Sequence, residues 1–228
     1  MLGGVLRGLR GNHNLNRPQA AEKKRAGAGV HNFRAFHVMG DTMSDLLKRS
    51  ALAYKELMPY RYHFTLGRKG QLRHLSIHFP EVAYHHLAGF HRAGMAALSN
   101  KKKSLETVLA GAVTYEHFKR AGAVLEDRWT GICRLKEIIE SNRVVFYYRG
   151  HEQPGSMLEG DYLMVHDGVA FFIAGGVPES IFEQTSRRYE QGCPRFVTLQ
   201  ISREEMATSI VTCLFRSATF IEKNVKSH

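Results

Sequence analysis

The stretch that decides the fold runs from Tyr60 to Gly94 and reads YRYHFTLGRKGQLRHLSIHFPEVAYHHLAGFHRAG. In its first half, apolar residues alternate with polar ones, which is the period of a β-strand with one buried face. The pattern predicts strands over residues 60–66 and 72–79. The intervening Gly67-Arg68-Lys69-Gly70 supplies two glycines for a tight turn, so we expect a β-hairpin that exposes Arg68 and Lys69 at its tip.

The second half of this stretch predicts a helix that carries the densest chemistry in the chain. Pro80 suits the first turn of a helix, and residues 82–92 read VAYHHLAGFHR. Glycine inside a helix is less favourable than alanine by about 1 kcal/mol. Gly89 therefore indicates a structural reason, such as the close approach of another element or of a ligand.

The rest of the chain divides into a helical part and a β-rich part. Helical periodicity covers residues 44–57 before the hairpin, and further helical segments lead to a longer helix over 125–140. We expect a short polar helix over 180–189 and a helical start to the C-terminal segment at Arg203. The fold class predicted is α+β: a helical N-terminal part with a β-hairpin, followed by a small antiparallel sheet. Strands of that sheet are expected at residues 144–148, 162–165, 170–173 and 196–201.

Composition predicts three regions. Residues 1–43 are basic, rich in Gly, Arg, Asn and Ala, and lack a sustained apolar period, so we expect a poorly ordered extension. Met43 directly precedes a good helix start, which is compatible with translation beginning there. Residues 44–201 would form the folded domain, and residues 202–228 a C-terminal tail.

The net charge of +11 resides in the first half of the chain. Residues 1–43 carry seven Lys or Arg against two acids, residues 44–103 carry eleven against three, and residues 104–228 carry fourteen against sixteen. Such asymmetry favours a polyanionic partner, because cations near phosphates release counterions on binding. A basic protein with a solvated face is the alternative.

Hydropathy and cysteine content indicate the compartment. The best apolar run, residues 169–177, is much shorter than the ~20 residues that span a bilayer. Three widely spaced cysteines form neither a disulfide framework nor a CxxC pattern. We therefore expect no contact with a membrane and a reducing, cytoplasmic location.

Six of the thirteen histidines lie between residues 63 and 91. A zinc site on a helix requires histidines at i and i+4, whereas His85, His86 and His91 are one, five and six residues apart. No HExxH motif and no nearby Asp or Cys completes a ligand set. The spacing therefore disfavours a metal, and we expect no cofactor.

General acid–base catalysis is the chemistry that these residues favour. A histidine with a near-neutral pKa can take a proton from a ribose 2′-hydroxyl, and a second group can return one to the leaving 5′-oxygen. Cations and hydroxyl donors stabilise the charge that develops on phosphorus. The candidates are His86, His91 and Ser156 for catalysis and Arg92, Arg68 and Lys69 for phosphate binding, with Gly89 in a structural role.

The segment from the hairpin to FHRAG resembles the phage-associated Barnase–EndoU–colicin–RelE-like (BECR) nucleases, fourth phage subfamily, which carry an aromatic-x-H-L-x-G-hydrophobic-H signature. Here the signature spans Tyr84 to His91. The similarity covers residues 44–201, and its further matches are VLAGAVTYEHFKRAG, SNRVVFYYRG and Ser156 with DYLMV. The resemblance implies a helical part followed by a small antiparallel sheet. It places His86, Gly89 and His91 on the motif positions and Ser156 on a polar position ahead of a strand.

The resemblance also implies an activity, that of a metal-independent ribonuclease carried as a toxin or effector by phages and mobile elements. RNA would be the substrate, and an immunity protein a partner. Two alternatives remain open on the sequence. One is a nucleic-acid-binding module without catalysis, in which Arg68, Lys69 and residues 101–103 contact phosphate. The other is a structural protein of a mobile element, in which His86 is a core residue.

Overall fold

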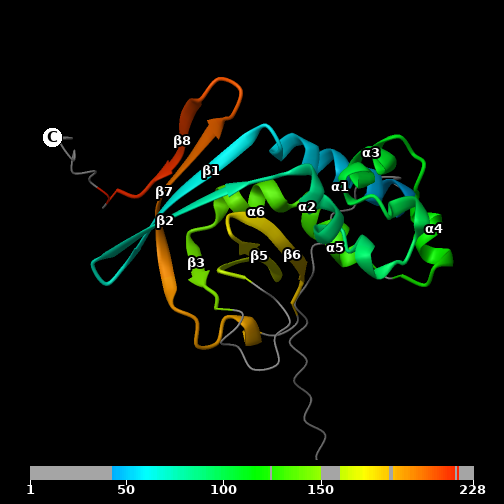
Figure 1. The fold of residues 1–228 in the computed structure, drawn as a ribbon. Coiled ribbons are helices and arrows are strands. Elements are labelled where there is room, and N and C mark those ends of the chain that lie inside the picture. Colours follow the sequence, from blue (N-terminus) through cyan, green and yellow to red (C-terminus); the bar gives the residue numbers. More distant parts are fainter. Residues whose placement is uncertain (1–42, 124, 150–159, 185–186, 219, 221–228) are drawn as a thin grey trace, which may run out of the picture. The chain divides into compact units, whose positions relative to one another are not determined.

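The computed structural model describes residues 43–123, 125–149, 160–184, 187–218 and 220. Residues 39–228 belong to one compact unit and residues 1–38 to another, and none of the latter is described. The described chain is α+β, as predicted: helices accompany one antiparallel sheet (Figure 1).

Six α-helices and several short 3₁₀ helices occur among the described residues. The longest, α1 (Met43–Leu57), precedes the hairpin, and α2 (Glu81–Leu87) follows it. A 3₁₀ turn at Lys101–Lys103 leads directly into α3. The remaining helices are α3 (Ser104–Leu109), α4 (Tyr115–Arg120), α5 (Glu126–Cys133) and α6 (Leu135–Ser141).

The long strand β7 organises the sheet. The order is β2-β1-β7-β3-β4-β5-β6, and every pairing is antiparallel. One edge of β7 pairs with β1, whereas the other edge pairs with β3 near its start and with β8 near its end. The strands are β1 (Tyr60–Arg68), β2 (Gln71–His78), β3 (Val144–Tyr147), β4 (Tyr162–His166), β5 (Val169–Ala174), β6 (Val177–Glu183), β7 (Arg195–Glu205) and β8 (Ile210–Arg216).

The sheet curls until its first strand meets the far end of its path. The backbone N–H of His78, at the end of β2, donates a hydrogen bond to the carbonyl of Gly176 in the β5–β6 turn, at 3.0 Å. Gly176 has φ +77°, and a Cβ there would lie 2.5 Å from the Ser76 carbonyl oxygen. Only glycine fits this contact, so one residue allows the curl.

The helices pack into the curled sheet through buried aromatic rings. Tyr54 of α1 lies 5.3 Å from Tyr84 of α2, measured between ring centroids. Phe118 of α4 lies 5.2 Å both from Phe90 and from Trp129 of α5. These side chains are almost fully buried and belong to one core that also contains the inward-facing residues of β1 and β2. The core therefore fixes α2 against α1, and the turn that follows α2 against α4 and α5.

Three sequence expectations are wrong in detail. The helix expected over 125–140 is two helices that meet at Arg134. The sequence does not reveal the break, because the apolar stripe continues across it. Residues 177–183 form β6 rather than part of a polar helix, and the 3₁₀ turn at Arg187–Tyr189 is the helical part of that segment. The segment after Arg203 is not helical: β7 continues to Glu205 and pairs with β8.

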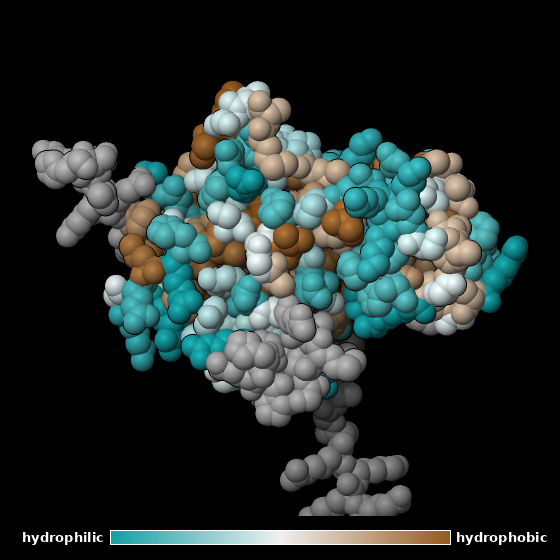
Figure 2. All heavy atoms as spheres, viewed as in Figure 1, coloured by the Kyte–Doolittle hydropathy of each residue, from teal (hydrophilic) through white to brown (hydrophobic). Residues whose placement is uncertain are grey.

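An apolar region projects from the sheet at the β7–β8 hairpin. Met206, Ile210 and Val211 are exposed at the end of the β7–β8 hairpin, where Figure 2 shows apolar side chains. Among the described residues, none of the helices combines the length and the apolar character needed to cross a lipid bilayer.

The contact between α5 and β6 yields a test of the packing. A Cβ on Gly131 would lie 2.9 Å from Cγ1 of the buried Ile181. Alanine gains about 1 kcal/mol of helix propensity over glycine, but overpacking a core costs about 1–3 kcal/mol. We expect Gly131→Ala to lower the free energy of unfolding by about 1 kcal/mol, measured by urea denaturation.

The variant Ile181→Ala supplies the control, because it removes the atom that the new methyl group would meet. Alone it should destabilise the protein by about 2–5 kcal/mol through cavity formation. In that background, Gly131→Ala should be neutral or stabilising. Equal effects of Gly131→Ala in both backgrounds would contradict the packing argument.

Candidate active site

His86 and His91 would lie on different faces of a continuous helix, but they come together because α2 ends before His91. The helix stops at Leu87, and Gly89 adopts a left-handed conformation with φ +79°. The chain then forms a 3₁₀ turn over Phe90–Arg92 that directs His91 back toward α2. The ring centroids of His86 and His91 are 5.5 Å apart, with the rings inclined by 38°. The structural role predicted for Gly89 stays a proposal, and its backbone conformation supports it.

The neighbouring His85 lies buried beneath this pair. Its Nδ1 is 2.8 Å from the hydroxyl oxygen of Ser104, whose own proton is donated to the Asn100 carbonyl. Nδ1–H of His85 is therefore the donor to Ser104. Burial, followed by the charges of His86, Lys101 and His91, lowers the pKa of His85 from 6.5 to about 4. His85 thus joins α2 to the start of α3 and to Lys101–Lys103.

Arg128 and Trp129 of α5 hold the turn from the other side. The Trp129 indole N–H donates to the Ala88 carbonyl at 3.2 Å. Arg128 Nη1 lies 3.3 Å from the Leu87 carbonyl and 3.4 Å from the Ser180 hydroxyl. A Cβ on Gly89 would lie 2.9 Å from Arg128 Cδ. Arg128 thus occupies the space that a side chain at residue 89 would need.

Arg128 is a buried cation without an acid partner among the described residues. Its residue surface is 7% exposed, and its guanidinium donates hydrogen bonds to a carbonyl and a hydroxyl oxygen. Burial and the nearby charge of Arg92 lower its pKa to about 10, so the guanidinium stays charged at neutral pH. A desolvated charge of this kind favours an anion. Sequence reasoning missed Arg128, because no local pattern places it beside residues 86–91.

The cluster as a whole is cationic, and we refer to His85, His86, His91, Arg92, Lys101 and Arg128 as the histidine cluster. Burial lowers the pKa of His91, and the charges of His86, Arg92, Arg128 and Lys101 lower it further. His91 is therefore neutral near pH 7 and can accept a proton. Anions such as phosphate are the ligands that this electrostatic environment favours.

The other predicted site residues do not lie in this cluster. Arg68 ends β1 and Lys69 lies in the β1–β2 turn, at the opposite end of the hairpin from α2. The Arg68 guanidinium lies 5.9 Å from the Phe196 ring centroid. Ser156 lies outside the described residues, so its proposed part in catalysis rests on the sequence. The structure brings together His86 and His91 and places Arg92 close enough to act on His91.

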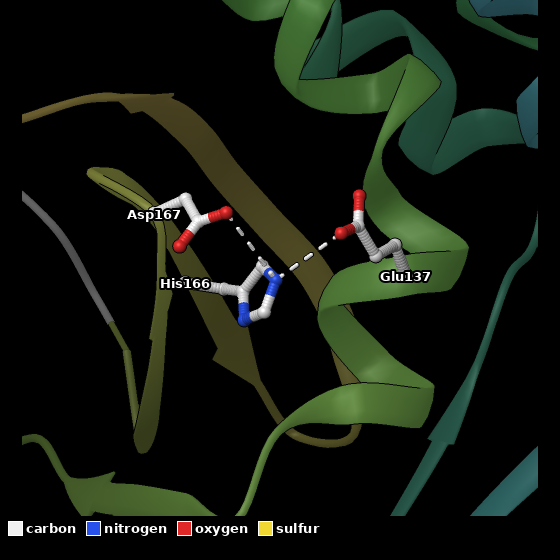
Figure 3. A group of neighbouring side chains, drawn as sticks. All are labelled: Glu137, His166 and Asp167. Atoms are coloured by element: carbon white, nitrogen blue, oxygen red, sulfur yellow. Dashed lines mark hydrogen bonds and ion pairs between the residues drawn. The ribbon is translucent and has the colours of Figure 1, made fainter. Parts of the chain in front are cut away.

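A second histidine group, Glu137, His166 and Asp167, has donor atoms close enough to bind a cation (Figure 3). His166 Nε2 lies 3.3 Å from Glu137 Oε1 and 3.8 Å from Asp167 Oδ2. However, Arg134 bridges the same two carboxylates, at 3.5 Å from Glu137 and 3.1 Å from Asp167. Its positive charge already balances them and would repel a metal ion. We interpret the group as an ion-pair network that ties α6 to the β4–β5 turn.

Fold and site together are those of an α+β protein with a phosphate-favouring cluster, and comparison with known families agrees. A family model described as phage-Barnase-EndoU-ColicinE5/D-RelE like nuclease4 matches residues 46–175. The match covers more than half of the chain, which therefore belongs to this nuclease family and confirms the resemblance stated above. It includes the whole histidine cluster, whereas β6, β7 and β8 follow it. No curated protein and no solved structure matches significantly.

A glycine pair tests the packing of the turn. Gly89→Ala introduces a left-handed alanine, which costs about 1–2 kcal/mol, and also overlaps Leu125 and Arg128. Gly94→Ala has the same backbone cost at φ +59° but meets nothing within 4 Å. We expect Gly89→Ala to reduce the free energy of unfolding by at least about 1 kcal/mol more than Gly94→Ala, in urea denaturation. Similar losses in both variants would contradict the role of Gly89 as space for Arg128.

The lowered pKa of His85 predicts a pH dependence of stability. Because the unfolded chain binds a proton on this residue near pH 6.5 and the folded chain only near pH 4, stability is complete above pH 6.5. It should fall as the pH decreases from 6.5 to 4 and then level off. His91, whose pKa is also lowered, acts in the same direction.

The measurement is the urea midpoint between pH 4 and 7. His85→Asn retains a donor for Ser104 but does not titrate, so its midpoint should fall less over this range than that of the wild type. His74→Asn, on an exposed position of β2, should keep the wild-type dependence. Parallel curves for wild type and His85→Asn would show that His85 is not held neutral by burial.

Proposed function

We propose that this protein is a metal-independent endoribonuclease that cleaves RNA by transesterification at the histidine cluster. The observation that carries the proposal is the approach of the His86 and His91 rings to 5.5 Å beside a buried arginine. Membership of a nuclease family supports a nucleic acid as the substrate class. The site offers two proton-transfer groups and a cation, which are the groups that RNA transesterification needs. RNA is therefore the favoured polymer, because its 2′-hydroxyl supplies the nucleophile.

The two imidazoles divide the proton transfers between them. Neutral His91 takes the proton of the ribose 2′-hydroxyl, and the 2′-oxygen forms a bond to phosphorus. The bond between phosphorus and the 5′-oxygen breaks, and protonated His86 gives its proton to that oxygen. The products are a 2′,3′-cyclic phosphate and a free 5′-hydroxyl. The lowered pKa of His91 supports its assignment as the base.

The surrounding cations stabilise the charge on the phosphoryl oxygens in the transition state. Arg128 is fixed by its bonds to Leu87 and Ser180, so its charge is positioned before the substrate arrives. Arg92 and Lys101 are exposed and add charge at the rim. A divalent cation would be repelled by this set, which supports the proposal that no metal or other cofactor takes part. Ser156 remains a proposed hydroxyl donor.

The biological setting belongs to the same proposal. The family resemblance supports a toxin or effector that acts on RNA in the cytoplasm and is held in check by an immunity protein. A nucleic-acid-binding module without catalysis is the second candidate. The exposed Lys101–Lys103 turn next to the histidine cluster favours it, because three adjacent lysines can contact phosphates whatever the role of His86.

Cleavage of a labelled single-stranded RNA in the presence of EDTA tests the proposal. We expect the wild type to cut and to leave 2′,3′-cyclic phosphate ends. His86→Ala and His91→Ala should each reduce the rate by about 10²- to 10⁴-fold, the usual loss for a general acid or base. An oligonucleotide of the same sequence with 2′-deoxyribose should remain intact, because it lacks the nucleophile.

His74→Ala is the matched control and should cut at the wild-type rate, since this histidine lies on an exposed position of β2. Circular dichroism and urea denaturation verify that the cluster variants are folded. Cleavage by the wild type that depends on a divalent ion, or equal rates for wild type and folded His86→Ala, would exclude the mechanism. RNA binding without cleavage would favour the non-catalytic module.

A further inference from the structure

A second group of cations lies on the concave face of the curled sheet, stacked on aromatic rings. The guanidinium carbon of Arg73, on β2, lies 4.2 Å from the ring centroid of Tyr147 on β3 and 5.4 Å from that of Phe196 on β7. Arg68 approaches Phe196 at 5.9 Å, and Arg149 approaches Tyr147 at 5.2 Å. We refer to Arg68, Arg73, Tyr147, Arg149, Tyr162 and Phe196 as the arginine–aromatic face.

The strand register explains why these residues share one face. Arg73 lies opposite Leu66 and has the same alternation as the buried Leu75 and Ile77, so it points to the concave side. Tyr147 lies opposite Tyr162, with ring centroids 5.6 Å apart. Arg73 reaches over β1 and β7 to β3, which only the curl of the sheet allows.

The face lies at the end of the sheet where the apolar core stops. Strand β3 begins just after α6, and His166 at the end of β4 contacts α6. Tyr147 and Tyr162 occupy the other ends of these two strands, away from α6. Phe196 is buried, whereas Arg68, Arg73, Tyr147 and Tyr162 are partly exposed. The face thus consists of a buried phenylalanine ring covered by partly exposed arginine and tyrosine side chains.

Neither Arg68 nor Arg73 forms an ion pair with an acid among the described residues. Arg73 is held instead by its contacts with the rings of Tyr147 and Phe196. Guanidinium planes and tyrosine rings are surfaces on which unpaired bases stack, and free guanidinium N–H groups bind phosphate. Paired bases in a duplex do not expose the faces that such stacking needs.

We propose that the arginine–aromatic face binds single-stranded nucleic acid through base stacking and phosphate contacts. This inference deepens the proposed function, on which it rests for the identity of the polymer, by assigning an unpaired strand as the substrate class. Lys69, exposed in the adjacent turn, extends the positive charge toward the tip of the hairpin. The face and the histidine cluster are separate sites, because Arg73 and His78 are five residues, or about 17 Å, apart along β2 and α2 follows His78.

Fluorescence anisotropy with a labelled, 2′-O-methylated single-stranded oligoribonucleotide of about ten nucleotides tests the proposal, since this probe binds but cannot be cleaved. We expect Arg73→Gln and Tyr147→Leu each to weaken binding about fivefold or more, the loss expected when one stacked base is released. Tyr147→Phe keeps the ring and should stay within about twofold of the wild type. A hairpin duplex of the same sequence should bind less tightly than the single strand.

Arg61→Gln is the control for lost charge, because Arg61 is exposed on β1 with the alternation opposite to the core-facing Tyr62. It should weaken binding less than Arg73→Gln. Equal binding by Arg61→Gln and Arg73→Gln, loss in Tyr147→Phe as large as in Tyr147→Leu, or equal affinity for strand and duplex would each overturn the proposal. Urea denaturation verifies that each variant is folded.

The two proposals fail separately in these assays. His74→Ala, on an exposed position of β2 with the alternation opposite to that of Arg73, should bind the uncleavable probe as the wild type does. A protein that binds the strand through this face but cleaves nothing retains the present inference and loses the ribonuclease mechanism. A protein that cleaves RNA at the histidine cluster while Arg73→Gln binds normally retains the mechanism and loses the face.

Discussion

The candidate site depends on two hydrogen bonds from α5 to the backbone where α2 ends. Trp129 and Arg128 bind the carbonyls of Ala88 and Leu87, which the helix itself leaves without partners. With the carbonyls satisfied, the chain can leave the helix at Gly89 and turn back. A continuous helix would place His91 five residues from His86, about 140° around the axis, and the rings would point apart. The broken helix brings them to 5.5 Å.

The position of Arg128 beside this turn also affects the electrostatics of the histidine cluster. Arg128 fills the space beside Gly89 and is buried there with its charge. Burial lowers the pKa of His91, and the charges of His86, Arg92, Arg128 and Lys101 lower it further. A histidine with a lowered pKa is a proton acceptor at neutral pH, whereas a neighbouring acid would have had the opposite effect. Arg128 thus supports the backbone turn and is one of several charges that act on His91. This arrangement supports the structural role proposed for Gly89, which lies between the two histidines of the motif.

The sequence was sufficient for the features with a local signal. Period-two alternation predicted the β1–β2 hairpin, and the motif from Tyr84 to His91 led to the family, which is confirmed. It was insufficient where partners are distant in the chain. Arg128 becomes part of the site only through Leu87 and Ser180, 41 and 52 residues away. Residues 180–183 were expected to begin a polar helix, yet Ser180 is buried in β6, where it contacts that same arginine.

The hairpin determines where several cations from the first half of the chain lie. Strands β1 and β2 separate its cations into two sets: Arg68, Lys69 and Arg73 near the tip, and Arg92 with Lys101–Lys103 beyond α2. The tip arginines lie on aromatic rings. Such a surface suits unpaired bases of any identity, because every base has a flat face that can stack. Of the cations beyond α2, Arg92 and Lys101 act on the imidazole of His91. A polyanion that contacts both sets would extend along the hairpin. If both proposals hold, the length of β2 sets the spacing between the stacked nucleotides and the phosphate proposed to react.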